Sequence, residues 1–245
     1  MSDVIQAFKF CGIDKYLVDA LVKTHIYFAS PTQLNDPFDC RVNIARSLTR
    51  AIDKASGESK SKLSGILVLL DRFATKFQED VAGLGVFSFS SEMMNTVMWS
   101  HYADGHRGVC LYYELPTKVL DYGVNGVVGV SPVEYANDAL TEWFLSDAID
   151  LADAGFKELQ IELMKKVLTI KSEDWKYENE SRLLSSAVGA IDIAPAYLKQ
   201  ICFGLAASPS DIDLVSRLVQ THYSDVRLVK VESDGSDFGI IANGI

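Results

Sequence analysis

One polar segment, enclosed by two strand-like segments, constrains the fold of this chain more than any other feature. Gly85–Ser90 alternates apolar and polar residues, and Val109–Glu114 is β-branched and aromatic, so both are expected to be strands. Between them, Met98 and Tyr102 recur at helical spacing, and Asp104-Gly105 is a turn signal. A helix that packs on a sheet is therefore expected here.

The rest of the chain alternates helical and strand-like segments in the same way. Helices are expected at 14–24, 56–80, 91–102, 138–170 with a break near Gly155, and 208–223; strands are expected at 25–29, 126–135, 201–204 and 226–231. Ser91 is the expected cap of the helix that carries Met98. This order predicts one α+β domain over residues 1–245, a mostly antiparallel or mixed sheet surrounded by helices, with a helical insertion at about 138–170.

The composition of the chain limits the kinds of molecule that it is expected to bind. A formal net charge of −10 repels phosphate backbones and argues against non-specific nucleic-acid binding, although a local basic pocket for one nucleotide remains compatible with it. The apolar run Ile66–Leu70 is too short to cross a bilayer, and the first residues lack a secretion signal. A cytoplasmic protein without a membrane partner is expected. The four scattered cysteines predict reduced thiols rather than a zinc site.

The helix and turn carry five candidate residues. His101 and Asp104, three residues apart, can meet on one helix face, where the carboxylate would raise the basicity of the imidazole. This pair is either a catalytic base with its partner or a pair that fixes the helix end. His106 and Arg107 could hold an anionic group or complement the negative helix end. Tyr102 is a candidate for stacking on a ligand ring.

A second group of charged residues alternates further along the chain. If the stretch is extended, all of its members point to one side; they are Lys176, Glu178, Glu180 and Arg182. A solvent-exposed edge strand explains this pattern, and so does a pocket lined by two acids and two bases. Trp175 and Tyr177 would then anchor the opposite face in the core.

The Asn35-Asp36-Pro37 segment predicts a rigid turn, because Pro37 excludes helical angles at Asp36. Asn35, Asp36 and Asp39 could bind a ribose or a metal, or serve only the turn. Metal binding ranks below nucleotide binding, because no pair of acids and histidines has a recognised ligand spacing.

Four segments together resemble a bacterial family known as domain of unknown function 2971. They are Tyr27–Pro31, Asn35–Asp39, Met98–Asp104 and Trp175–Arg182, within a likeness that runs from about Lys9 to Gly204. The chain departs from the family pattern at Phe8-Lys9-Phe10 and at Ser181, where the family has a tyrosine-rich segment and a tryptophan. The resemblance implies that these segments belong to one architecture and meet in one cleft; it implies no activity.

Two functions of different classes are compatible with these residues. Lys9 on an early strand, Ser88 and Ser90 on a middle strand, and Glu178 with Glu180 on a late one are similar to the basic–serine–glutamate order of ADP-ribosyltransferases. This order predicts a nucleotide-processing enzyme that cleaves NAD. The alternative is a non-catalytic ligand-binding or sensor module in a stress or phage-defence system. A metal-dependent nuclease or hydrolase ranks third, and the oligomeric state stays open.

Overall fold

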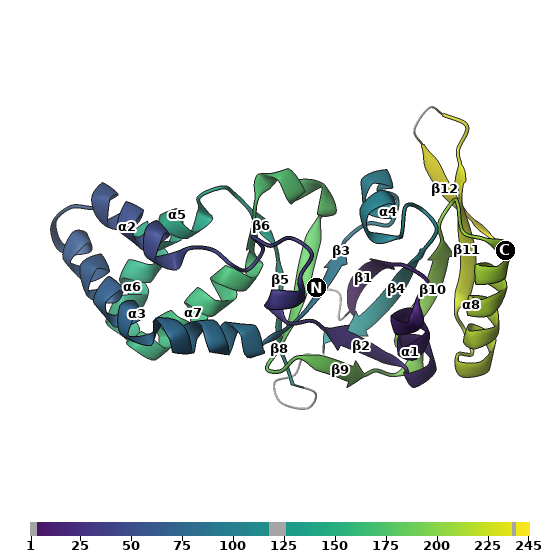
Figure 1. The fold of residues 1–245 in the computed structure, drawn as a ribbon, viewed down its shortest axis with the longest axis horizontal. Helices are drawn as coiled ribbons and strands as arrows, with labels where there is room; N and C mark the ends of the chain where they lie inside the picture. The colour runs from purple at the N-terminus through teal and green to yellow at the C-terminus, as the bar shows by residue number, and fades with distance from the viewer. Residues whose placement is uncertain (1–3, 118–125, 237–238) are drawn as a thin grey trace.

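The computed structural model describes residues 4–117, 126–236 and 239–245, and it is built on an eight-stranded mixed sheet (Figure 1). The strand order is β12-β11-β10-β4-β1-β3-β8-β5, in which β10 and β11 are parallel and the other neighbours are antiparallel. Its strands are β1 (Val4–Cys11), β3 (Gly85–Ser90), β4 (Val109–Pro116), β5 (Val127–Pro132), β8 (Glu180–Ser185), β10 (Leu198–Phe203), β11 (Arg227–Ser233) and β12 (Ile240–Gly244). The expected single α+β domain with a mixed sheet is confirmed.

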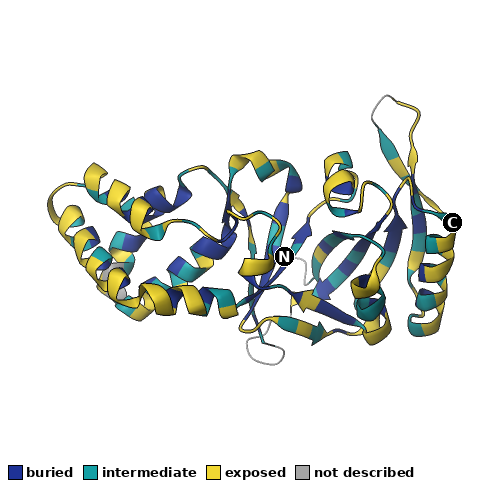
Figure 2. Ribbon diagram, in the orientation of Figure 1, coloured by how far each residue is buried: buried dark blue, intermediate teal, exposed yellow. Residues whose placement is uncertain are grey.

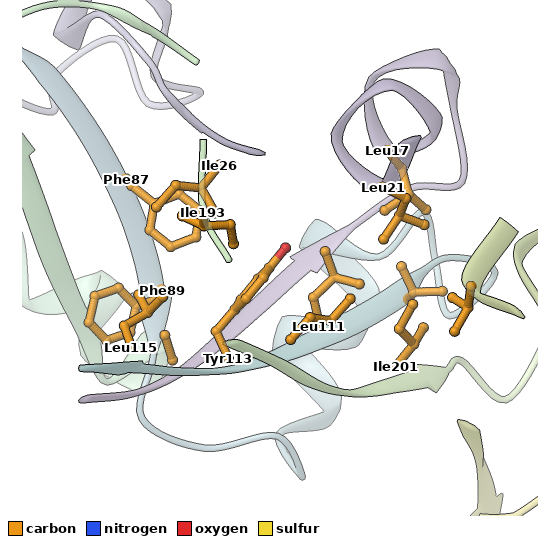
Figure 3. Close-up of a cluster of buried hydrophobic side chains, with 14 of the residues drawn as sticks. Leu17, Leu21, Ile26, Phe87, Phe89, Leu111, Tyr113, Leu115, Ile193 and Ile201 are labelled. Carbon is orange, nitrogen blue, oxygen red and sulfur yellow. The ribbon is translucent and has the colours of Figure 1, made fainter. Parts of the chain in front are cut away.

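One face of the sheet is covered by α1 (Lys15–Lys23), α8 (Pro209–His222) and a separate two-stranded antiparallel sheet of β2 (His25–Phe28) and β9 (Gly189–Asp192). Figure 3 shows Leu17 and Leu21 of α1 directed toward Leu111 of β4 and Ile201 of β10. Asp14, the first residue of the helix expected at 14–24, caps α1 by accepting from the amides of Tyr16 and Leu17.

The opposite face carries α4 (Thr96–Tyr102), the short helix expected between β3 and β4. Trp99 is completely buried there and meets Phe10 edge to face, with ring centroids 5.2 Å apart. The expected cap was wrong by four residues: Asn95, not Ser91, accepts from the amides of Val97 and Met98. Ser91 lies in the turn that ends β3, so the helix starts later than its apolar spacing indicated.

A helical lobe lies beyond the β5 edge of the sheet, with its outer surfaces exposed (Figures 1 and 2). It consists of α2 (Ile44–Lys54), α3 (Gly57–Gly83), α5 (Ala139–Leu145), α6 (Asp147–Ala154) and α7 (Phe156–Thr169). Its core is mainly aliphatic, contains Phe77, Trp143 and Phe144, and includes Val86 and Leu184 from the sheet. Gly155, at φ 138°, separates α6 from α7, which explains the expected break.

The charged stretch near residue 180 differs from its expected extended conformation. Residues Glu173–Glu178 form a 3-10 helix, η3, and Asn179 adopts a left-handed conformation before β8 begins. Trp175 and Tyr177 are half-buried rather than core residues, and Lys176 is exposed. The regular alternation of charges therefore does not describe their directions.

The remaining elements are short: β6 (Glu134–Tyr135) pairs in parallel with β7 (Ile170–Lys171), and η1 (Pro31–Gln33) and η4 (Pro195–Tyr197) are 3-10 turns. In the part of the chain that the structure describes, no helix combines the length and apolar character that crossing a membrane requires.

Candidate functional site

The register of three adjacent strands builds the candidate site. Phe8 of β1 pairs with Ser90 of β3, and Ser90 pairs with Glu180 of β8. Residues in register across a sheet project from the same face, so these side chains form one row. Above it lies a pocket of about 360 Å³, which Tyr102 and Met98 of α4 also line. This volume is within the range of small-molecule sites.

The sheet is open between β1 and β3 at this point. The two strands share a single register pair, whereas β1 and β4 share eight. Lys9 follows Phe8 and by alternation belongs to the face of Ala7, yet its ammonium donates to the carbonyl of Ser88, 2.8 Å away, and lines the pocket. Burial lowers the pKa of Lys9.

A buried ion network forms the floor of the site, and Arg182 is its centre. Arg182 is 0% exposed and holds both oxygens of Asp39, at 3.0 and 2.6 Å, and both oxygens of Glu180, at 2.7 and 3.1 Å. It also donates to the Leu168 carbonyl, 2.8 Å away, and to Cys40. Six hydrogen bonds from one guanidinium fix the loop that carries Asp39 against β8 and the end of α7.

Lys171 is the second buried cation, and sequence reasoning missed it. Its ammonium donates to Glu178 and lies 3.0 Å from Glu180 and 3.7 Å from Asp39. Glu178 in turn accepts from the hydroxyl of Tyr102. Glu178 and Glu180 thus converge on one lysine although they leave the backbone from a 3-10 helix and a strand.

The pKa values of the two glutamates are shifted in opposite directions. Burial raises the pKa of Glu178, and the neighbouring Lys171 only partly offsets this effect. Burial also raises the pKa of Glu180, but the charge and hydrogen bonds of Arg182, together with Lys171 and a hydrogen bond from Ser88, outweigh it and lower the pKa to about 2. Glu180 therefore stays ionised at neutral pH, whereas Glu178 takes up a proton more readily than a free glutamate does.

The Asn-Asp-Pro turn contributes one side chain to this pocket. Asn35 lines it and donates to the Tyr102 hydroxyl over 3.2 Å. Asp36 instead closes its own turn by accepting from the amide of Phe38. On the far side, the Tyr135 hydroxyl accepts from the backbone amide of Glu180 at 2.7 Å, a second contact that the sequence did not reveal.

The other four helix-and-turn candidates, unlike Tyr102, lie outside the residues that line this pocket. His101 is exposed and its Nδ1 is 2.9 Å from the Tyr177 hydroxyl, so the expected pairing with Asp104 was wrong. Asp104 accepts two bonds from Arg107, at 3.0 and 2.8 Å. His106 lies 3.1 Å from the Ser100 hydroxyl. These contacts hold the turn after α4.

The sequence did contain a signal for Lys171. It follows four apolar or small residues, 167–170, at the end of a helix, and a lysine in such a position is buried only when acids surround it. The expected lysine, Lys176, is exposed instead. The convergence of the Asn35, Tyr102 and Glu178–Arg182 segments matches the expected common cleft.

Two other cavities lie in and beside the helical lobe. A cavity of about 580 Å³ beside α3 is lined mainly by aliphatic side chains, including Leu70, Val81 and Val167. Another of about 310 Å³, next to α2, shares Asp39 and Lys171 with the candidate site. Among the described residues, no cluster of histidine, cysteine or acidic side chains suits a metal ion.

The molecule is thus an α+β protein with a buried ion network beneath an open pocket of its sheet. Residues 98–183 match the family described as Protein of unknown function (DUF2971), the family that the motifs predicted. The matched segment runs from α4 into β8 and contains Tyr102, Lys171 and the two glutamates. Searches among curated proteins and solved structures gave no match.

Proposed function

We propose that the protein binds a nucleotide by its ribosyl part in the pocket between β1, β3 and β8 and cleaves the N-glycosidic bond of NAD, in the manner of an ADP-ribosyltransferase. One observation carries the proposal: Lys9 of β1, Ser88 of β3 and Glu180 of β8 come from three adjacent strands and line one pocket with Glu178, which ends η3 just before β8. This is the basic–serine–glutamate order on neighbouring strands.

The chemistry requires a carboxylate near the ribose. As the bond between C1′ and the pyridinium nitrogen breaks, nicotinamide leaves with the bonding electrons and positive charge develops on the ribose. Water or an acceptor hydroxyl then bonds to C1′, and its proton passes to solvent. A fixed carboxylate stabilises that charge and accepts from a ribose hydroxyl.

Glu178 is better suited to this role than Glu180. Glu180 has both oxygens bound by Arg182, and one of them also by Lys171. Glu178 has one partner on each oxygen, Tyr102 and Lys171, which leaves lone pairs free for a ligand. We assign Glu180 to holding Arg182 and Lys171 in place, and Tyr102 to the stacking and orientation of the base.

Nicotinamide release from NAD tests the proposal. The wild-type protein should release nicotinamide, and Glu178→Gln, which preserves shape, should lower kcat by about 100-fold or more, as loss of one electrostatic group does in other enzymes. Glu173→Gln, on the exposed start of η3, is the matched control and should leave release unchanged. Absence of release, or release that Glu178→Gln does not reduce, contradicts the proposal.

The second candidate is a non-catalytic binding module. It is favoured by the saturation of Glu180 and Asp39 by Arg182, which describes a static floor of paired charges rather than a free base. Stabilisation in a thermal-shift measurement by NAD, a sugar or a divalent ion, with the ligand recovered intact, would support this candidate and exclude the enzyme.

A further inference from the structure

The charges that line the candidate pocket are unusual for a site that holds phosphate. The described lining residues include three acids, Asp39, Glu178 and Glu180, but only two bases, Lys9 and Lys171. Arg182, at the centre of the floor, is fully buried and forms ion pairs with Asp39 and Glu180. Together these six groups carry no excess positive charge for an anionic ligand.

Both lining bases are also engaged. The Lys171 side chain is 4% exposed and is surrounded by Glu178, Glu180 and Asp39. The Lys9 ammonium donates to the Ser88 carbonyl and lies 5.1 Å from the centroid of the Phe87 ring. A phosphate would have to displace these partners, and a buried carboxylate left without its cation is costly.

The rest of the lining includes five aromatic side chains, and these favour a ring. Phe8 of β1 and Tyr102 of α4 line the pocket, and the lining also contains Phe10, Phe89 and Tyr27. Aromatic faces attract cations, and carboxylates do so more strongly. A flat ring with positive charge, attached to a group with hydroxyl donors, is complementary to both features.

We propose that the ligand of this pocket is a nucleoside without phosphate, and that a positively charged N-riboside such as nicotinamide riboside is preferred to its phosphorylated forms. This inference rests on the proposed function and specifies its substrate class. In the reaction, water adds to C1′ of the riboside, nicotinamide leaves as a neutral base, and one proton is released with ribose. The net charge of −10 acts in the same direction, since it repels phosphates before they reach the pocket.

The experiment compares nicotinamide riboside, nicotinamide mononucleotide and NAD as substrates of the full chain. We expect kcat/KM for the riboside to exceed that for each phosphorylated compound by about tenfold or more at low salt, because like charges within the pocket interact strongly. The preference should narrow as the ionic strength rises. Equal or better use of the phosphorylated compounds overturns this inference and leaves the proposed function standing.

Binding of the same three compounds, measured by calorimetry, distinguishes a failure of this inference from a failure of the proposed function. If none of the three compounds is cleaved, the proposed function is wrong, and the order of their affinities still decides the preference for an unphosphorylated ligand. Tighter binding of the phosphorylated compounds, or binding of none, refutes it.

A matched pair of variants adds a gain of function. Tyr27 lines the pocket and is half exposed, so Tyr27→Arg introduces a cation without burying it and should improve the relative affinity for the mononucleotide severalfold. Tyr16→Arg makes the same change on α1, where the side chain is 71% exposed and outside the pocket, and should leave the preference unaltered. An equal effect of both variants would mean that overall charge, not the pocket, determines the selectivity.

Discussion

At the scale of single residues, Glu178 and Glu180 show that position outweighs residue type. Burial raises the pKa of both, but only Glu180 has the guanidinium of Arg182 against both oxygens. A carboxyl whose pKa is lower in the folded state stabilises the fold above its unfolded pKa, and this stability is lost as the pH falls. For Glu180 the loss runs from about pH 4.5 down to about pH 2.

Glutamine variants should therefore respond to pH in opposite ways. Glu180→Gln should reduce the free energy of unfolding at pH 7 by about 3 kcal/mol, in line with the difference between 4.5 and about 2, and the deficit should shrink towards pH 2. Because the pKa of Glu178 is raised in the folded state, its ionisation lowers the free energy of unfolding as the pH rises above 4.5. Glu178→Gln removes this ionisation, so the free energy of unfolding of that variant should decline less over the same pH range. Urea unfolding between pH 2 and 7 measures both; parallel profiles would contradict the assignment.

Arg182 gives the strongest single-residue prediction. Its replacement by Met leaves Asp39 and Glu180 buried without their main cation, which costs about 3–5 kcal/mol. The exposed pair of Arg107 and Asp104 is the control, and Arg107→Met should leave the urea midpoint within error. A comparable loss in the two variants would show that the ion network does not hold the loop to β8.

At the scale of elements, the sequence located most strands and helices but not how they begin and end. Alternation identified β3 and β4, and Asp14 identified the start of α1. Ser91 and Asn95 are both good caps by residue type, and only the packing of Trp99 under the sheet selects the second. For the same reason, alternation of Lys176, Glu178 and Glu180 could not reveal a 3-10 helix that ends in the left-handed Asn179.

Substitution of the two cap candidates tests the start of α4. Asn95→Ala removes the acceptor for Val97 and Met98 and the donor to the Tyr177 carbonyl, 2.7 Å away, so the protein should lose about 1–2 kcal/mol in urea unfolding. Ser91→Ala should change the midpoint little. The reverse order would return the cap to Ser91 and extend α4 towards β3.

At the scale of the whole molecule, what the sequence could not reveal is the strand order and the opening between β1 and β3. Those features depend on contacts between distant segments: β1 lies between β4 and β3, and β8 joins the sheet from beyond residue 180. The candidate site depends on the same contacts, since Asp39 is far along the chain from Lys171 and Arg182. Motifs identified its members, except Lys171 and Tyr135, whereas folding alone determines which of them touch.

The helical lobe and the sheet share strands, and this predicts one cooperative unit. Val86 and Leu184 pack into the lobe, while their neighbours Phe87 and Leu183 pack on the side of the sheet that α1 covers. Arg182 further ties β8 to the end of α7 through Leu168. A change that destabilises either core should therefore destabilise the other, and unfolding should be a single transition.

The tryptophans provide local reporters for this test. Trp143 lies in the lobe on α5 and Trp99 lies under the sheet on α4. In two variants that each retain one of these residues, with the other tryptophans replaced by Phe, fluorescence and circular dichroism should give the same urea midpoint within each variant. A fluorescence midpoint of the Trp143 variant that precedes its dichroism midpoint would mean that the lobe unfolds first, and that the shared strands and Arg182 do not couple the two cores.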